Sequence, residues 1–231
     1  IPLRIIVGDL LKKQVYKDYR RKLKECSPEV RMLVNAAGFG RNGTFQEIAR
    51  ESKKLQTDMV DLNCRALTQM IRLTLPYMNK GGRIINIASA AAFCPQPSFA
   101  VYAATKSYVL SLSRALHTEL KPGGIIVTAV CPGPVDTEFF RISGPLTDPL
   151  KKLTLAKAPA VVHQALTDSR RRKEISIYGI SMKAARLGAK TIPHGLILKA
   201  EGFMQRRKNR EKHCVTEVRK KNYERDKNKF K

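Results

Sequence analysis

Strand-like and helix-like segments alternate along this chain, and that alternation constrains its fold more than any other feature. Short apolar runs suited to buried strands recur, and longer stretches with apolar side chains at helical spacing lie between them. Parallel strands need long crossover connections, and a helix is the usual crossover. The sequence therefore predicts an α/β fold built on a parallel sheet.

The predicted elements follow one another without an internal repeat. The expected strands are Arg4–Gly8, Val30–Val34, Arg83–Ala88, Ile125–Cys131 and Glu174–Tyr178. The expected helices are Leu11–Cys26, a segment opened by a Thr44/Glu47 capping box, Met59–Met78, Tyr102–Leu120 and Ala160–Asp168. Beyond them lies a cationic helical stretch, Ile180–Ala200. We predict a domain over 1–178, a basic helical extension over 179–207 and a charged, disordered tail over 208–231.

Composition limits the class of protein. With 231 residues, 43% of them hydrophobic, the chain is long enough to bury one sizeable core. Its apolar runs are too short to span a membrane, and it opens without the features of a secretory signal. The 5 cysteines share no metal-ligating spacing, which argues against a disulfide framework or a zinc site. We therefore expect no metal and a reducing, cytoplasmic location.

The formal net charge of +25 is the unusual number in the composition. Such a surface attracts anions, including nucleic acid, anionic lipid and phosphorylated cofactors, although a solvated basic face is the simpler interpretation. The chain has no Trp and offers no aromatic stacking platform, so we do not expect nucleic acid as a partner.

One basic stripe of the extension has two interpretations. Lys183, Arg186 and Lys190 share a helix face, beside an apolar stripe of Met182, Ala185, Ala189 and Ile192. The pattern suits a helix lying on an anionic membrane surface, and it equally suits a helix packed on its own domain.

Tyr102, Lys106 and Ser89 carry the candidate chemistry. Tyr102 and Lys106 are four residues apart on a predicted helix, so both side chains project from one face. At about 5 Å and an effective dielectric of about 20, an ammonium favours a phenolate by about 3 kcal/mol, or roughly two pKa units. We therefore expect the Tyr102 pKa to move from about 10 towards neutrality. Ser89, at the carboxyl end of a strand, can orient the reacting oxygen.

These residues resemble the signature of the short-chain dehydrogenase/reductase family. Tyr102-Ala103-Ala104-Thr105-Lys106 resembles its YxxxK motif, and Ser89 precedes Tyr102 by the family's usual thirteen residues. The turn Asn35-Ala36-Ala37-Gly38 resembles the family's NNAG turn, with Ala36 in place of the second asparagine. Pro132 and Gly133 resemble the turn that contacts the nicotinamide.

The resemblance implies an NAD(P)-dependent oxidoreductase that moves hydride between a nicotinamide and a carbonyl or alcohol, with NADP(H) favoured over NAD(H). The implied catalytic residues are Asn63, Ser89, Tyr102 and Lys106. The implied cofactor contacts are Asp9, Leu10, Asn35, Ala36, Ala37, Gly38, Tyr102, Lys106, Pro132, Gly133, Val135 and Thr137. In these roles Tyr102 exchanges the proton, Lys106 holds the ribose and Asn63 holds a relay water. Asp9 would serve equally well as a helix cap, and for Thr137 a cap of the next helix is the less favoured alternative.

The resemblance also implies a Rossmann-like doubly wound parallel sheet that is truncated at its N-terminus. The family's glycine-rich phosphate loop precedes the strand matched by Arg4–Gly8, so the first two strands and helices would be missing. In the family's strand order those strands separate Arg4–Gly8 from Val30–Val34. We therefore expect Arg4–Gly8 to lack a partner, Val30–Val34 to expose an apolar edge and the chain to be unstable or prone to aggregate.

An apolar substrate is expected from the variable segment that follows the Pro132 turn. Phe139, Phe140, Ile142 and Leu146 suggest an apolar lid, and so a 3-oxoacyl-like or steroid-like carbonyl compound. The basic extension resembles that of bacterial members, and the complete protein is expected to form a homo-oligomer. The alternative is a catalytically inactive fragment, or a basic binding protein that uses the same fold to contact nucleic acid or anionic membrane.

Overall fold

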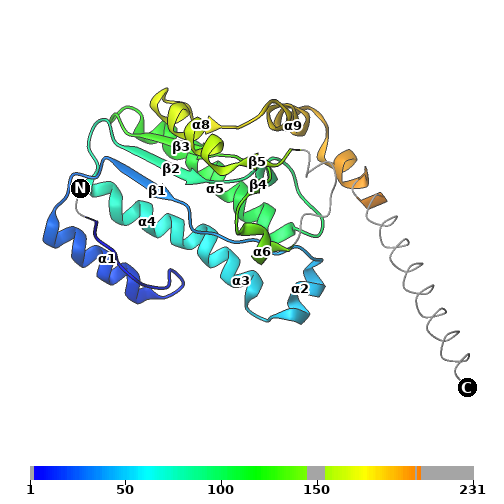
Figure 1. Ribbon diagram of the computed structural model, residues 1–231, viewed down its shortest axis with the longest axis horizontal. Helices are drawn as coiled ribbons and strands as arrows, with labels where there is room; N and C mark the ends of the chain where they lie inside the picture. Colours follow the sequence, from blue (N-terminus) through cyan, green and yellow to red (C-terminus); the bar gives the residue numbers. More distant parts are fainter. Residues whose placement is uncertain (1–2, 145–153, 201, 204–231) are drawn as a thin grey trace, which may run out of the picture. The chain divides into compact units, whose positions relative to one another are not determined.

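The computed structural model describes residues 3–144, 154–200 and 202–203 (Figure 1). The chain divides into two compact units, Ile1–Thr191 and Ile192–Lys231. The first unit contains the sheet, the candidate site and helix α9 (Ile180–Thr191), which the sequence analysis had grouped with the extension. In the second unit, residues 194–200 are helical. The tail predicted over 208–231 lies outside the described residues.

The main sheet consists of parallel strands in the order β1-β2-β3-β6. The strands are β1 (Met32–Asn35), β2 (Arg83–Ile87), β3 (Ile126–Val130) and β6 (Ile175–Ser176). Their register aligns Leu33 with Ile84, and Ile84 with Val127. A short parallel pair, β4 (Val135–Asp136) with β5 (Ala156–Lys157), follows the main strands. The predicted parallel sheet is confirmed.

Helices cover both faces of this sheet (Figure 1). The described helices are α1 (Lys13–Cys26), α2 (Phe45–Glu51), α3 (Leu55–Val60), α4 (Leu67–Thr74), α5 (Ala100–Leu120), α6 (Phe139–Ser143), α8 (Ala158–Arg170) and α9. On one face, α4 and α5 pack against β2 and β3 through Ile71 and Val109. On the other face, α8 contributes Val161 and Ala165. This arrangement confirms the Rossmann-like doubly wound fold.

The predicted helix Met59–Met78 contains an irregularity that the sequence did not reveal. Asp61–Ala66 forms a π-helical turn between α3 and α4, and a 3₁₀ turn over Leu75–Tyr77 ends the element. Such turns widen a helix locally and are frequent at functional sites. Asn63 lies in the widened turn, buried at 2% exposure.

The prediction of a buried strand at Arg4–Gly8 is wrong. The segment forms no strand, and Ile5 and Val7 are 74% and 92% exposed. An apolar run forms a stable strand only where a neighbour completes its ladder and a packed layer covers it, and the described residues supply neither. β1 ends the sheet, and its Val34 is 50% exposed, as expected for an uncovered apolar strand.

A buried carboxylate joins α8 to the last strand. Asp168 is 2% exposed, and it accepts hydrogen bonds from Ser176 Oγ and Gln164 Nε2, both at 2.8 Å. Lys173 Nζ lies 2.7 Å from the second carboxylate oxygen. Burial alone would raise the Asp168 pKa, but hydrogen bonds from Gln164, Lys173 and Ser176 outweigh it and hold that pKa below its ordinary value.

Replacing Asp168 should therefore destabilise the fold in a pH-dependent way. We expect Asp168→Ala to lower the free energy of unfolding by about 2–3 kcal/mol at pH 7, because bonded partners are left unpaired. A depressed carboxyl pKa stabilises the fold above its ordinary value of about 4, and this contribution is lost as pH falls further. Urea unfolding at pH 7 and near pH 3 measures both effects. Asp18→Ala, at a surface ion pair on α1, is the control, and equal costs for both variants would contradict the expectation.

Candidate functional site

The carboxyl ends of β1 and β2 are tied together by two amide side chains, a half-buried one on Asn35 and a buried one on Asn86. Asn35 Nδ2 on β1 donates to Asn86 Oδ1 on β2 at 2.8 Å, and Asn86 Nδ2 donates to Ser113 Oγ on α5 at 2.9 Å. Asn86 is fully buried, so these bonds form away from competing water. They fix α5 against the strand ends, where ligands bind in open α/β sheets.

Tyr102 and Lys106 lie on the buried face of α5. Their exposures are 7% and 6%, and Lys106 Nζ lies 5.6 Å from the centre of the Tyr102 ring. The same ammonium donates a hydrogen bond of 2.8 Å to the backbone carbonyl of Ile87, at the end of β2. The predicted shared helix face is therefore present, and the sheet itself holds the lysine in place.

Ser89 follows β2 and faces Tyr102. Its half-buried side chain accepts a hydrogen bond from Ala91 N at 3.1 Å, and its proximity to the Tyr102 phenol lowers the tyrosine pKa. Ala90 N donates to Pro132 O at 2.8 Å, so the turn after β2 is anchored to the turn after β3. Ser89, Tyr102 and Lys106 thus form one group.

Asn63 and Gly38 complete this group from the other side. Asn63 Oδ1 accepts from Phe39 N at 3.1 Å, and its Nδ2 donates to Phe39 O at 2.9 Å and to Thr105 Oγ1 at 3.0 Å. A Cβ on Gly38 would lie 2.8 Å from Asn63 Oδ1 and 3.4 Å from Lys106 Nζ. The loop after β1 can approach the lysine this closely because residue 38 is glycine.

Burial shifts the pKa values of Tyr102 and Lys106, and the shift of Tyr102 differs from the expectation. Burial raises the pKa of Tyr102 to about 12, and the proximity of Ser89 offsets only part of this rise. Burial also lowers the pKa of Lys106 to about 8. The predicted fall of the tyrosine pKa is therefore wrong, because loss of water outweighs an ammonium that lies beside the ring and bonds to Ile87. The phenol keeps its proton at neutral pH.

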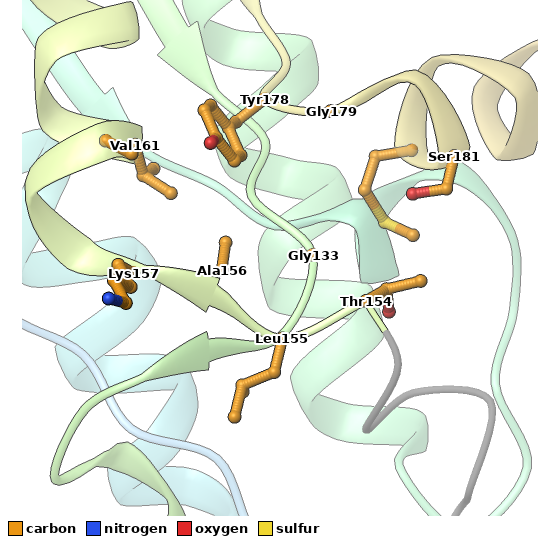
Figure 2. A pocket seen from close by; sticks show the side chains of 11 residues that line it. Gly133, Thr154, Leu155, Ala156, Lys157, Val161, Tyr178, Gly179 and Ser181 are labelled. Atoms are coloured by element: carbon orange, nitrogen blue, oxygen red, sulfur yellow. The ribbon is translucent and has the colours of Figure 1, made fainter.

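The turn after β3 contacts α9. A Cβ on Gly133 would lie 2.6 Å from Met182 Sδ, so the helix packs directly on this glycine. Beside the contact is a hollow of about 340 Å³, also lined by Leu155 and Lys157 near β5 and by Tyr178 and Ser181 near α9 (Figure 2). Gly133 therefore contacts α9 and lines this hollow.

The remaining predicted cofactor contacts are placed as follows. Asp9 Oδ1 accepts from Leu11 N at 2.8 Å in the turn before α1, and Leu10 packs into the cluster around α1 and α4. Ala36 and Ala37 are exposed beside Gly38. Val135 lies in β4, and Thr137 Oγ1 accepts from Phe139 N at 3.4 Å just before α6, whose N-cap residue is Glu138.

Aromatic rings surround Tyr102, and the sequence analysis did not identify all of them. Phe99 stacks on Tyr102 with centroids 4.3 Å apart, and the centroid of Phe139 lies 5.5 Å from that of Tyr102. Phe140 contacts Phe139 edge-on, whereas the Ile142 side chain and Leu146 lie outside the described residues. The contact of Phe99 with Tyr102 could have been predicted from their i, i+3 spacing in the sequence. The loop after β1 could have been identified from the close spacing of its glycines, Gly38, Gly40 and Gly43. The middle one, Gly40, is buried against these rings.

Curated relatives of this chain are oxidoreductases. An uncharacterized oxidoreductase of Staphylococcus epidermidis is 32% identical over 139 residues, which are 59% of this chain and 59% of that protein. The very-long-chain 3-oxoacyl-CoA reductase of Bos taurus is 36% identical over 163 residues, 68% of this chain and 51% of that protein. The chain thus spans between half and three fifths of these relatives' lengths.

Solved structures share the fold. A short-chain dehydrogenase from Sphingobium yanoikuyae in complex with NADPH matches with a TM-score of 0.65 and 28% identity, covering 80% of this chain and 74% of that one. The bulky-bulky ketone specific alcohol dehydrogenase from Comamonas testosteroni matches with a TM-score of 0.60 and 26% identity, over 81% and 73%. The family model described as short chain dehydrogenase matches residues 2–144, more than half of the sequence. This chain belongs to the short-chain dehydrogenase family.

Proposed function

We propose that this protein is a nicotinamide-dependent reductase of carbonyl compounds in which Tyr102 donates the proton. The observation that carries the proposal is the buried Tyr102 phenol, which lies near Ser89 and has the Lys106 ammonium 5.6 Å from its ring centre. Because burial raises its pKa to about 12, the phenol is protonated at neutral pH. A proton donor at this position suits reduction of a carbonyl oxygen to an alcohol.

The surrounding residues position the acid and the reacting oxygen. The Ser89 hydroxyl would hydrogen-bond the carbonyl oxygen and aim it at Tyr102, and the Lys106 cation would stabilise negative charge that develops there. Asn63 holds the loop of Phe39 and Gly38 against α5, which keeps this geometry fixed.

The residues present fit the nicotinamide end of a dinucleotide. Gly38 offers bare backbone beside the Lys106 ammonium, and a side chain at residue 38 would fill that space. Gly38, Lys106 and the Pro132–Gly133 turn would hold the nicotinamide riboside, and the bound cofactor would supply the hydride. NADP(H) rather than NAD(H) is supported by the net charge of +25, which favours an additional phosphate, and by the NADPH bound to the similar Sphingobium enzyme.

A 3-oxoacyl-like carbonyl compound is the proposed substrate. The rings of Phe99, Phe139 and Phe140 gather at Tyr102 and suit an apolar chain beside the reacting carbonyl. The vertebrate relatives named very-long-chain 3-oxoacyl-CoA reductase support this class over a steroid-like one.

A homo-oligomer stays a prediction, and a reducing location such as the cytoplasm is supported by the free cysteines of the described chain.

Tyr102→Phe should remove turnover and leave the fold intact. The phenylalanine keeps the ring contacts but has no proton to give, so we expect the rate of NADPH oxidation with a 3-oxoacyl thioester to fall at least about 100-fold. NADPH affinity, followed by its fluorescence, should change little. Tyr108→Phe is the matched control, since Tyr108 is a 42% exposed tyrosine on the same helix. Turnover in Tyr102→Phe within about tenfold of the parent would mean that another group supplies the proton.

The pH profile should report Lys106. Its pKa of about 8 means that the side chain is a cation below that pH and neutral above it. We expect both NADPH affinity and the rate of reduction to fall as pH rises through about 8, because the positive charge is lost. In Lys106→Met the affinity should be lower and should no longer change across this range. A fall of equal size and position in that variant would assign it to another group.

Contact with an anionic membrane surface is a second proposal, supported by α9. Met182 packs on Gly133, which shows part of the helix against its own domain, but Ile180 and Leu187 are 84% and 64% exposed beside the exposed lysines 183 and 190. In the described part of the chain, no helix is long and apolar enough to cross a bilayer.

Vesicle binding tests this proposal. The protein should sediment with vesicles containing anionic phosphatidylserine at low salt and not with neutral phosphatidylcholine vesicles, because binding combines apolar contact with charge. Leu187→Glu should weaken sedimentation, and Val162→Glu, a similarly exposed site on α8, should not. Equal sedimentation with both kinds of vesicle would rule out the anionic contact.

A further inference from the structure

We infer that Gly40 and Phe99 are positioning residues for Tyr102. Together with Phe139 they form an aromatic slot that holds the Tyr102 ring and thereby aims its hydroxyl at Ser89. The inference rests on the proposed function of Tyr102. It concerns residues outside the Ser-Tyr-Lys set, and it assigns them a role in the reaction rather than in folding alone.

Three rings converge on the missing side chain of Gly40. A Cβ at this position would lie 2.7 Å from Tyr102 Cδ2, 2.9 Å from Phe99 Cζ and 3.0 Å from Phe139 Cζ. Carbon atoms without a bond between them do not approach so closely. The backbone of residue 40 therefore forms the floor of the slot, and only glycine leaves room for all three rings.

The two phenylalanines both contact the tyrosine ring. Phe99 is stacked, with centroids 4.3 Å apart and planes at 29°, and Phe139 is tilted, at 5.5 Å and 49°. Both separations lie within the range of favourable aromatic pairs. These two contacts restrict the movement of the Tyr102 ring and so keep its hydroxyl near Ser89.

Hydrogen bonds tie the loop of Gly40 to both phenylalanine-bearing segments. Gly43 N donates to Ser98 O at 2.9 Å, and Ser98 adopts a left-handed backbone, φ 60°, immediately before Phe99. Asn42 donates from both its backbone N and its Nδ2 to Ser143 O at the end of α6, each at 3.0 Å. The slot is therefore one connected unit assembled from three separate parts of the sequence.

The slot also explains why the Tyr102 phenol is shielded from water. Tyr102 belongs to an apolar cluster with Met59, Ala91 and Ala103, and the two phenylalanines pack against it. Opening this cluster would admit water, and a hydrated phenol loses its proton more easily than a buried one. Position and protonation of Tyr102 should therefore change together when the slot is altered.

Paired glycine substitutions test the floor of the slot. In the purified protein, with NADPH and a 3-oxoacyl thioester, Gly40→Ala should lower kcat at least about tenfold with the NADPH KM within about twofold, because the acid moves and the cofactor contacts do not. Gly123→Ala is the matched control, since its Cβ would meet only Leu120 O at 3.5 Å, an ordinary contact. Equal kcat for both variants would contradict the role of Gly40.

Phe99 variants keep the test decisive if Gly40→Ala fails to fold, which thermal unfolding would reveal. Phe99→Leu removes the stacked ring and should lower kcat about tenfold, whereas Phe45→Leu, at a 61% exposed phenylalanine on α2, should retain kcat within about twofold. Ultraviolet titration of tyrosinate, taken as the difference from a matching Tyr102→Phe protein, should show Tyr102 in Phe99→Leu ionising at lower pH than in the parent. This measurement needs no turnover.

The outcomes separate the two proposals. Full activity in Tyr102→Phe would reject the proposed function, whatever the slot variants do. Loss of activity in Tyr102→Phe, together with parental kcat and parental Tyr102 titration in Phe99→Leu, would overturn the positioning role alone. A lower kcat and an earlier titration in Phe99→Leu, both absent from Phe45→Leu, would establish it.

Discussion

Exclusion of water from one face of α5 is the condition on which the site depends. That face carries Tyr102 and Lys106 at the ligand end and Val109, Ser113 and His117 further along, and all of them are buried. The apolar residues bind the helix to the sheet, and the same packing removes water from the two titratable groups. Stability and chemistry thus share one interface, and a change that loosened α5 would alter both.

The fold could be predicted because local patterns determine it, and the site could be predicted in part. The alternation of strand and helix signals located β1, β2, β3 and β6, and the spacing of Tyr102 and Lys106 placed both on one helix face. Arg4–Gly8 was predicted wrongly because a strand is stabilised by its neighbours rather than by its own apolar content. The direction of the Tyr102 pKa shift was also wrong. It depends on the depth of burial and on the carbonyl that holds Lys106, and neither is visible in a sequence.

Long-range packing explains what else the sequence did not show. Gly40, Phe99 and Phe139 come from three segments, and their meeting at Tyr102 depends on hydrogen bonds such as that between Gly43 and Ser98. Short glycine spacings identify a loop that approaches something closely, but they do not say what it approaches. Family likeness did not supply this information either, since it rests on the motif residues themselves.

The π-helical turn over Asp61–Ala66 has a consequence for how this region tolerates mutation. Such a turn holds more residues than an ordinary α-helical turn, so deleting one residue could restore a regular helix. The deletion would remove the local widening that carries Asn63, whereas α3 and α4 would keep nearly the same relative orientation, because one residue fewer at i→i+4 spacing makes about the same rotation. Asn63 could then no longer reach Phe39 and Thr105, although every side chain of the site would still be present. Changes of length should therefore be selected against here more strongly than most changes of residue type, and alignments of relatives should show this stretch free of gaps.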